Sequence, residues 1–484
     1  MRFTLYLVLL FATLPFVLTR PFFGLCVYYV VSLMQPKMLC WRGDFQDGML
    51  VGVPLVMGAI AFGIKRRTLL PQKDHRSGSI LSVRETLTRN PLFEPSWPLA
   101  LMVVLLMYVS VTRFLVPTPI SNNSYSYRSL IKLLTVIILL TGLAADLRRF
   151  RILYIVVAMS TAFWAIKGGF KVILLGPHQV YGRTYDNNLF ALLSVMSLPM
   201  VFYYALSVRH ARWRAALLVC AALICLAIIG SRSRAGFVAL AFVLACMAWS
   251  SRFHLRAIVA AGLVAVVAWT MSSQEIRERV TSIIEYRNDK SAMSRFATWD
   301  IAMELLDQNP MIGVGFGNFE YAKDKYIGGR KAAHNIFLQN LSELGLIGHP
   351  LWLAIIIGTI ISLFRLMRRS RSFPPEMRWA YYWSRGLLLG MIAFCIHGFF
   401  HNEEYLELML VMCGLNVALH AVIRREAWHR YLNAAVAAAK ERTRAARQAK
   451  AKKRKRPVEA LNLMFSPSQP RSVALATSPS SVVV

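Results

Sequence analysis

Residues 209–256 read RHARWRAALLVCAALICLAIIGSRSRAGFVALAFVLACMAWSSRFHLR, and this stretch decides the class of the fold. It holds two apolar runs back to back, with arginine-rich clusters at both outer ends. A bilayer core of about 30 Å takes roughly 20 mostly apolar residues per helical crossing. Because positively charged loops favour the cytoplasm, both outer ends belong there and the GSRSRAG turn belongs on the opposite face. The stretch therefore predicts a helical hairpin across a membrane.

The whole chain of 484 residues has the same character. It is 56% hydrophobic and only 17% charged, with a mean hydropathy of +0.47, which is too apolar for a soluble domain of this length. The apolar runs lack the alternation of barrel strands, so helices must satisfy the backbone in lipid. We expect an all-α polytopic membrane protein with about 12 transmembrane helices and one large periplasmic loop containing amphipathic helices.

Basic clusters orient the predicted helices. Placing these clusters in the cytoplasm gives eleven alternating crossings, near residues 48–64, 98–115, 129–146, 151–168, 188–206, 213–230, 234–250, 254–271, 345–365, 383–400 and 403–422. The first 36 residues hold two short apolar stretches broken at Arg20-Pro21. We expect a retained membrane segment there rather than a removed signal peptide. One net crossing gives twelve spans and a cytoplasmic N-terminus; two crossings give thirteen. We prefer twelve.

Three regions follow from this topology: an N-terminal transmembrane region (1–206), a transmembrane core (207–422) that includes a periplasmic loop (272–344), and a basic, largely disordered cytoplasmic tail (423–484). The other outward segments are about 37–47, 116–128 and 168–187. The net charge of +32 is explained by cytoplasmic loops and a polybasic tail attracted to anionic membrane lipids, and we predict no nucleic-acid partner. The seven cysteines contain no CxxC pair, and we predict neither a metal site nor a cofactor.

The large outward loop has internal order. Met293, Phe296, Trp299, Met303 and Leu306 recur at helical spacing and predict an amphipathic helix on the membrane surface. Asn309-Pro310 should end that helix, and the glycines of GVGFGNF (313–319) predict a tight irregular turn. A second helix is expected to begin near His334 and to continue into the next crossing.

Several outward residues could carry chemistry. Arg234, with its neighbour Arg232, is either an interfacial snorkelling arginine or an anion clamp, because guanidinium offers a bidentate fork to phosphate oxygens. Arg295 shares their compartment and could complete a diphosphate site, although alone it would be an ordinary surface charge. His334 could act as a general base or as a hydrogen-bond donor, or be merely structural. A cationic outward pocket would suit an anionic amphiphile such as a lipid phosphate.

Two further outward segments contain polar groups. In 167–188, Lys167 and Arg183 are cationic, Gly168-Gly169 permits close backbone approach, and Asp186-Asn187-Asn188 is expected to cap the next helix. His397 and His401 stand near Glu403 and Glu404, but their spacing fits no familiar zinc pattern.

At this point the sequence resembles the O-antigen ligase and polymerase superfamily of bacterial inner-membrane proteins. The resemblance is carried by SRFATWDIAMELLDQNPMIGVGFGNF (294–319), by HNIFLQNLSELGLIG (334–348) and by SRAG (233–236). KGG at 167–169, a pattern ending in DNN at 188 and the LPM at 198–200 resemble the O-glycosylation ligases associated with exosortase systems more narrowly.

The resemblance implies a membrane glycosyltransferase that uses no cofactor. Such enzymes move a glycan from undecaprenyl pyrophosphate to a lipid, polysaccharide or protein hydroxyl acceptor on the periplasmic face of the inner membrane. Arg234 and Arg295 would bind and neutralise the pyrophosphate, and His334 would lie beside the acceptor hydroxyl. The remaining substrate-binding residues are predicted to be Arg232, Lys167, Arg183, Asn335 and Trp299. A polysaccharide polymerase with the same donor and a non-enzymatic transporter of lipid-linked glycan remain alternatives.

Overall fold

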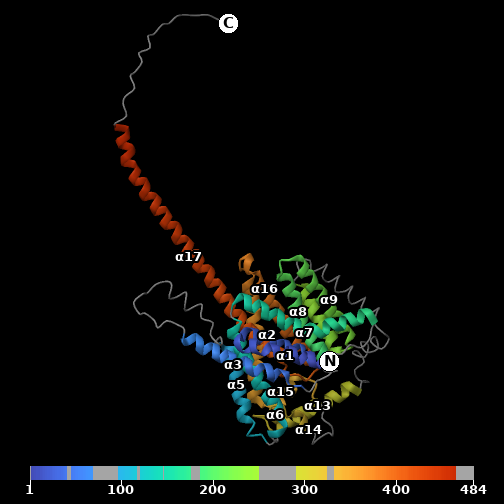
Figure 1. Cartoon of the computed structure of the whole chain (residues 1–484). Helices are drawn as coiled ribbons and strands as arrows, with labels where there is room; N and C mark the ends of the chain where they lie inside the picture. Colours follow the sequence, from blue (N-terminus) through green and yellow to red (C-terminus); the bar gives the residue numbers. More distant parts are fainter. Residues whose placement is uncertain are drawn as a thin grey trace, which may run out of the picture. The chain divides into compact units, whose positions relative to one another are not determined.

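A computed structural model describes residues 2–40, 45–68, 96–116, 120–144, 146–175, 186–249, 290–323 and 332–464 (Figure 1). This part of the chain is helical and contains no β-strand. The α-helices are α1 (Arg2–Thr19), α2 (Pro21–Tyr29), α3 (Asp47–Thr68), α5 (Trp97–Thr112), α6 (Ile120–Leu143), α7 (Leu147–Leu175), α8 (Asn187–Ser207), α9 (Ala211–Gly230), α10 (Arg234–Trp249), α13 (Lys290–Gln308), α14 (Phe319–Lys323), α15 (Ile336–Ser370), α16 (Arg378–Gly398) and α17 (Glu407–Met464). A π-helical turn (Val30–Met34) and 3₁₀ turns (Pro36–Cys40, Pro375–Met377) complete the described elements.

Many of these helices have the length and composition of membrane spans. Within the described residues, seven segments are long and apolar enough to cross a bilayer: Arg2–Thr19, Ser126–Leu143, Leu147–Leu175, Asn187–Ser207, Ala211–Gly230, Ile336–Ser370 and Glu407–Ala449. Shorter apolar helices cover Pro21–Met34, Asp47–Gly63, Trp97–Thr112 and Arg234–Trp249. The protein is therefore a multi-pass α-helical membrane protein. The expected crossing at 254–271 lies outside the described residues, and the count of twelve stays a prediction.

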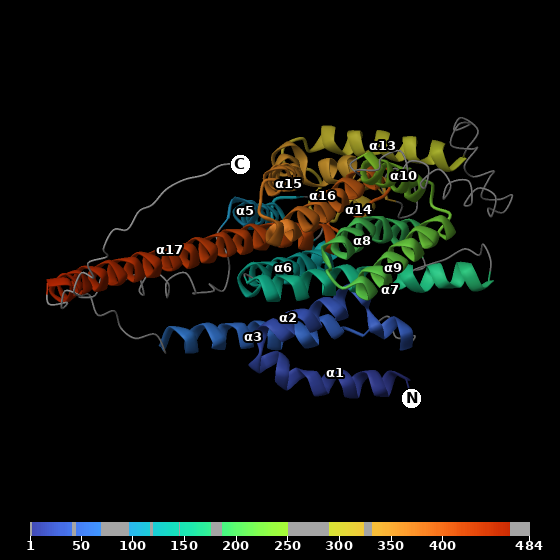
Figure 2. The ribbon, with the colours of Figure 1, turned by 90° about the horizontal axis from the view of Figure 1, so that it is seen from above.

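The chain divides into two units, Met1–Arg424 and Arg425–Val484, so residues 1–206 and 207–422 belong to one compact body. Within this body α16 packs against α8, α10 and α15, and α8 packs against α7 and α9 (Figure 2). Figure 2 shows α1, α2 and α3 grouped on one side of α6 and α7. α8 is almost wholly buried, whereas α1 exposes Leu5, Val8 and Leu9. Apolar side chains exposed in this way suit contact with lipid.

The helix α7 corrects the predicted loop at its end. Residues 168–175 were expected to belong to an outward loop, but α7 continues to Leu175 and carries Gly168 and Gly169 as helical residues. A Cβ added to Gly169 would collide with the backbone carbonyl of Leu223 in α9. The glycine therefore allows close backbone approach, as expected, but between two packed helices rather than around a ligand.

The helix α13 lies where an amphipathic helix was predicted and ends before Asn309-Pro310, and its position on a membrane surface stays a prediction. Thr298, Ala302 and Leu305 are buried, whereas Phe296 and Met303 are exposed. Two apolar stripes compete on this helix. The packed stripe is the one that faces the Gly-rich turn and the segment before His334, with which it forms a small separate core.

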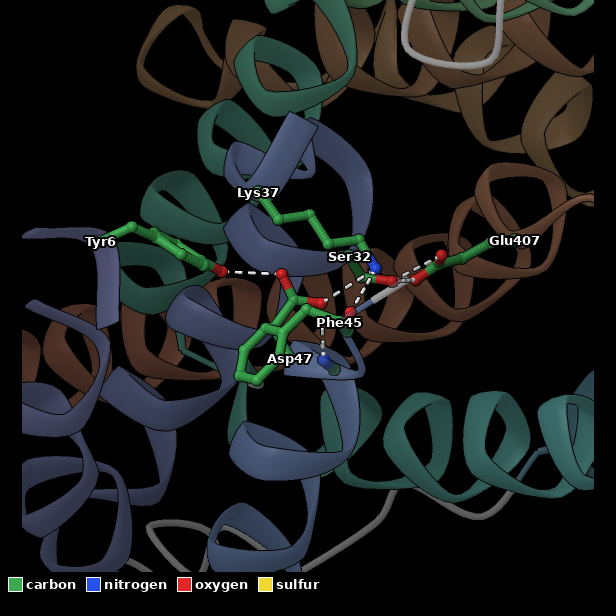
Figure 3. A network of polar contacts seen from close by, with 7 residues as sticks. Tyr6, Ser32, Lys37, Phe45, Asp47 and Glu407 are labelled. Atoms are coloured by element: carbon green, nitrogen blue, oxygen red, sulfur yellow. Dashed lines mark hydrogen bonds and ion pairs between the residues drawn. The ribbon is translucent and has the colours of Figure 1, made fainter. Parts of the chain in front are cut away.

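A polar network ties the N-terminal helices to the start of α17 (Figure 3). Tyr6 donates a 2.7 Å hydrogen bond to Asp47, and Lys37 Nζ lies 3.4 Å from the same carboxylate. Lys37 also donates to the Phe45 carbonyl at 2.6 Å. Ser32 Oγ lies 2.6 Å from both carboxylate oxygens of Glu407. These contacts join segments at opposite ends of the sequence in one end of the helical body.

The second unit differs from the tail expected at 423–484. Residues 425–464 continue as helix instead of lying largely disordered. Alanine, arginine and lysine dominate this segment, and all three are strong helix formers. Local propensity, which an argument from apolar content overlooks, explains the difference.

Candidate functional site

The turn between α9 and α10 holds the first two predicted site residues. Arg232 adopts a left-handed conformation with φ +56°, and Arg234 is the first residue of α10. The side chain of Asn187 donates to the Ser231 carbonyl at 3.2 Å, and Ser233 donates to the side chain of Asn188 at 2.7 Å. The arginine turn is therefore fixed to the beginning of α8.

The beginning of α8 is capped as the sequence predicts. The Asp186 carboxylate accepts hydrogen bonds from the backbone N–H groups of Asn188 (2.7 Å) and Leu189 (3.3 Å), which otherwise lack helical partners. A carboxylate at this position is also stabilised by the helix dipole. The DNN sequence therefore supplies both a cap and the two amides that face the arginine turn.

Arg295 and Trp299 lie on α13. The indole N–H of Trp299 donates to the Ala333 carbonyl at 2.9 Å, and its ring packs edge-on against Phe296. In the structure this donor holds the segment that leads into His334, and the predicted contact of Trp299 with substrate stays a prediction. The same hydrogen bond fixes the distance of Arg295, one helical turn away, from that segment.

His334 occupies the joint before α15. It has φ +53°, and the next residue, Asn335, caps α15 by accepting from the N–H groups of Phe337 (3.0 Å) and Leu338 (3.2 Å). Asn335 is buried, and its predicted contact with substrate stays a prediction. Among the described residues, Gln35, Arg232 and His334 are the non-glycine residues with positive φ. Such conformations are costly and concentrate at functional sites.

A pair of buried histidines lies where α16 ends and the joint to α17 begins. The rings of His397 and His401 meet edge to face, with centroids 5.6 Å apart, and both residues are at most 1% exposed. No described group makes a hydrogen bond with any of their four ring nitrogens. Buried polar atoms in a native fold usually have partners, so this pair faces a place where a ligand or water is needed.

Charged groups from several separate segments affect the pKa of His401. Burial lowers the pKa of His401 to about 4; the nearby positive charges of His334 and Arg295 act in the same direction, and Asp186 opposes them. These groups belong to α8, α13, the α15 joint and the α16–α17 joint. The structure therefore places Arg295 and His334 within electrostatic range of one buried histidine, beside the end of α8 that holds the arginine turn.

A buried chain of hydrogen bonds stabilises the segment just before His334. Gln339 accepts from the Ala333 N–H at 3.1 Å and donates to Glu404 at 3.1 Å. Burial raises the pKa of Glu404 well above its usual range, and the neighbouring Glu343 raises it further. The Glu404 carboxyl therefore releases its proton less readily than an exposed glutamate does.

Glu343 organises the Gly-rich turn. Its carboxylate accepts from the N–H groups of Gly317 (2.8 Å) and Phe319 (3.3 Å) and from the Tyr405 hydroxyl (3.1 Å). Gly313, Gly315 and Gly317 all have positive φ, which glycine adopts without steric cost. The predicted irregular turn is confirmed, and its partner is a glutamate that the sequence did not single out.

Lys167 and Arg183 are the remaining predicted residues. Lys167 is exposed on α7, with its Nζ 4.9 Å from the ring centroid of Trp164. Arg183 lies outside the described residues. The sequence reading did not place Asp186, Glu343 or Gln339 in the site, and it treated His397 and His401 only as poor metal ligands. Their chemistry was visible, but their proximity depends on tertiary packing.

The fold and the site define a class: a multi-pass helical membrane protein with a polar, arginine- and histidine-containing site at one end of its helical body. Residues 216–353 match the family model described as O-Antigen ligase (Wzy_C), so this segment of the chain is similar to the O-antigen ligases. No curated protein matches the chain. The match indicates a membrane enzyme of the O-antigen ligase or polymerase type, with a lipid-linked glycan and an acceptor as substrates in general terms.

The matched segment contains the arginine turn, Arg295, His334 and Glu343, but it stops short of the α16–α17 joint and begins after the cap of α8. Asp186 and the two buried histidines thus complete the site from outside the matched segment. The resemblance to exosortase-associated ligases remains an interpretation of the motifs around residues 167–200.

Proposed function

We propose that the protein is a glycosyltransferase that moves a glycan from undecaprenyl pyrophosphate to an acceptor hydroxyl. It would act on the periplasmic face of the bacterial inner membrane, with its C-terminus in the cytoplasm. One observation carries the proposal: Asp186, Arg295 and His334, from three separate segments, lie within electrostatic range of the buried His401, and Asp186 caps the end of α8 to which the arginine turn is hydrogen-bonded.

The arginines suit the leaving group of such a reaction. As the bond between the anomeric carbon and the pyrophosphate oxygen breaks, negative charge collects on the pyrophosphate. Arg234 and Arg295 would bind that charge, and preorganised donors stabilise a developing charge without reorganisation. Guanidinium remains charged at any physiological pH and offers two parallel donors to phosphate oxygens.

His334 suits the acceptor side. As the acceptor oxygen bonds to the anomeric carbon, its hydroxyl proton must leave, and a neutral imidazole can accept it near pH 7. The left-handed backbone at His334, held by the Asn335 cap on one side and by the Trp299–Ala333 hydrogen bond on the other, fixes where the ring can lie. His401, neutral because of its burial, could exchange hydrogen bonds with the substrates without adding positive charge.

The test is a transfer assay with purified full-length protein in liposomes. The donor is a labelled glycan on undecaprenyl pyrophosphate, and candidate acceptors carry lipid, polysaccharide or serine hydroxyls. Transfer of label to a non-polyprenyl acceptor by the wild type, and its loss in His334→Ala, would support the ligase. A lengthening ladder on the carrier would identify a polymerase instead. Carrier flipping that survives His334→Ala, without transfer, would contradict an enzyme.

Matched controls come from the starts of α9 and α16, the ends of these helices that do not lead into the site. His210→Ala removes an exposed histidine before α9, and Arg378→Ala removes an exposed arginine at the start of α16. Both changes should leave transfer at the wild-type rate. Loss of transfer in these controls as well would show that general destabilisation, rather than the site, explains the effect of His334→Ala.

A further inference from the structure

A cavity of about 440 Å³ opens beside the site, between the first turns of α6, the Gly-rich turn and the α16–α17 joint. Its volume falls within the roughly 300–1,000 Å³ typical of small-molecule sites. Gln339, which supports the segment before His334, forms part of its wall, and Asn402 of the wall follows His401 directly in the sequence. A ligand in this cavity would therefore lie next to the proposed catalytic residues.

The cavity is acidic in a strongly basic protein. Glu320, Glu343, Glu403 and Glu404 all line it, and no described lysine or arginine does, although the chain has a net charge of +32. Repulsion between carboxylates and phosphate or carboxylate groups disfavours an anionic ligand here. The pyrophosphate donor thus belongs to the arginine side of the site, and this cavity is left for a different substrate.

One of these carboxyl groups is buried and incomplete. Glu404 is only 5% exposed and uses one oxygen to accept from Gln339, whereas no described residue makes a hydrogen bond with its other oxygen, Oε2. A buried carboxyl oxygen without a partner is unfavourable. A ligand hydroxyl in the cavity would supply the missing partner.

The rest of the wall combines rings with neutral polar groups. The rings of Phe316 and Tyr405 lie with centroids 4.3 Å apart, and Tyr321 is a third aromatic. Ser129 and Asn402 add a hydroxyl and an amide. A pyranose ring has apolar faces that pack on aromatic rings and hydroxyls that pair with carboxyl and amide groups. This combination fits a sugar better than an acyl chain.

We propose that the cavity binds a sugar residue without negative charge that belongs to the acceptor, with Glu404 Oε2 accepting a hydrogen bond from a sugar hydroxyl. Its role as an acceptor site rests on the proposed function, whereas sugar binding by the cavity does not. The acceptor is then a saccharide whose residue in the cavity lacks uronate or phosphate groups. The two substrates approach the site from surfaces of opposite charge.

Direct binding to the purified full-length protein tests this inference. Saturation-transfer NMR would use three uncharged trisaccharides, built from glucose, mannose or N-acetylglucosamine, and trigalacturonic acid as the anionic probe. Ser129→Phe places a ring in the cavity, and Ile131→Phe is the matched control on an exposed position of α6 outside the wall. Glu404→Gln is a second variant that keeps size and one acceptor oxygen.

At least one uncharged trisaccharide should bind the wild type and the Ile131→Phe variant. The same sugar should bind about tenfold more weakly, or not at all, after Ser129→Phe or Glu404→Gln, and trigalacturonic acid should not bind. Equal binding of the anionic probe, wild-type binding by both cavity variants, or no sugar binding would each overturn the inference. Failure of glycan transfer with intact sugar binding would instead reject the proposed function and leave the sugar site standing.

Discussion

Replacing Glu343 should destabilise the Gly-rich turn, and the loss of stability follows from the hydrogen bonds that its carboxylate accepts. Three donors converge on this carboxylate: the N–H groups of Gly317 and Phe319 and the hydroxyl of Tyr405. In Glu343→Ala all three lose their acceptor in a buried place. A buried donor left without a partner costs about 1–3 kcal/mol. The Phe319 bond is long at 3.3 Å, and Tyr405 keeps a hydrogen bond from Asn340, so we expect a total of about 3–6 kcal/mol rather than the full sum.

Glu343→Gln should cost less, about 1–3 kcal/mol, because its amide oxygen still accepts while its NH₂ group opposes one of the donors. The assay is thermal inactivation of detergent-solubilised protein. Unfolding of large membrane proteins is often irreversible, so half-lives at one temperature are compared rather than midpoints alone. Glu304→Gln is the control. Glu304 is exposed on α13, and its side chain accepts a hydrogen bond from Gln308.

The expected order of half-lives is wild type and Glu304→Gln longest, Glu343→Gln intermediate and Glu343→Ala shortest. The reasoning is refuted if Glu343→Ala decays as slowly as the wild type, because three buried donors would then have found other partners at no cost. Equal loss in both Glu343 variants would show that charge, not the number of acceptor oxygens, holds the turn.

Three further predictions concern the site and the tail. Arg234→Ala and Arg295→Ala should each lower transfer by about 10²–10³-fold while the protein still inserts, and lysine should restore only part because it lacks the fork; wild-type transfer in either alanine variant would remove that arginine from the site. Because burial holds the pKa of His401 near 4, below the usual 6.5, the unfolded chain binds a proton that the folded one refuses between those values. Stability should fall as the pH drops from about 6.5 to about 4, measured as inactivation half-life; His401→Asn should flatten this dependence, and an unchanged slope would contradict it. Truncation after Arg424 should leave transfer intact, since that residue ends the compact helical body; an inactive truncated protein would assign the tail a role in catalysis or folding.

The sequence was most informative where a property is local. Apolar length predicted most of the helices, and the capping sequence Asp186-Asn187-Asn188, the stop at Asn309-Pro310 and the Gly-rich turn were all found where expected. Each of these depends on a few neighbouring residues and on the partners that helix ends require. The same reasoning succeeds at the Arg20-Pro21 break between α1 and α2.

Failures arose where packing chooses between equal local options. On α13 two apolar stripes compete, and only the neighbouring turn decides that Leu305 is buried and Met303 exposed. At the end of α7 the predicted topology began an outward loop at residue 168, although the helix continues there and Gly169 packs closely against Leu223 of α9. His401 could not be connected with Asp186 from the sequence, because more than two hundred residues separate them and only the fold brings them together.

The location of the site follows from the membrane itself. A regular helix in lipid must pair its own backbone groups, so polar chemistry is least costly where helices begin, end or break. The described site is built from such joints: the cap of α8, the α9–α10 turn, the joint before α15 and the α16–α17 joint. Both Arg232 and His334 adopt left-handed backbones there, and each is fixed by hydrogen bonds from a neighbouring joint or helix to adjacent residues. Because no single helix carries the arrangement, its geometry depends on how the joints are fastened to one another. The match to residues 216–353 covers the arginine turn and His334, whereas Asp186 and His401 lie in joints outside it, where we expect the parts of the site that differ between substrates.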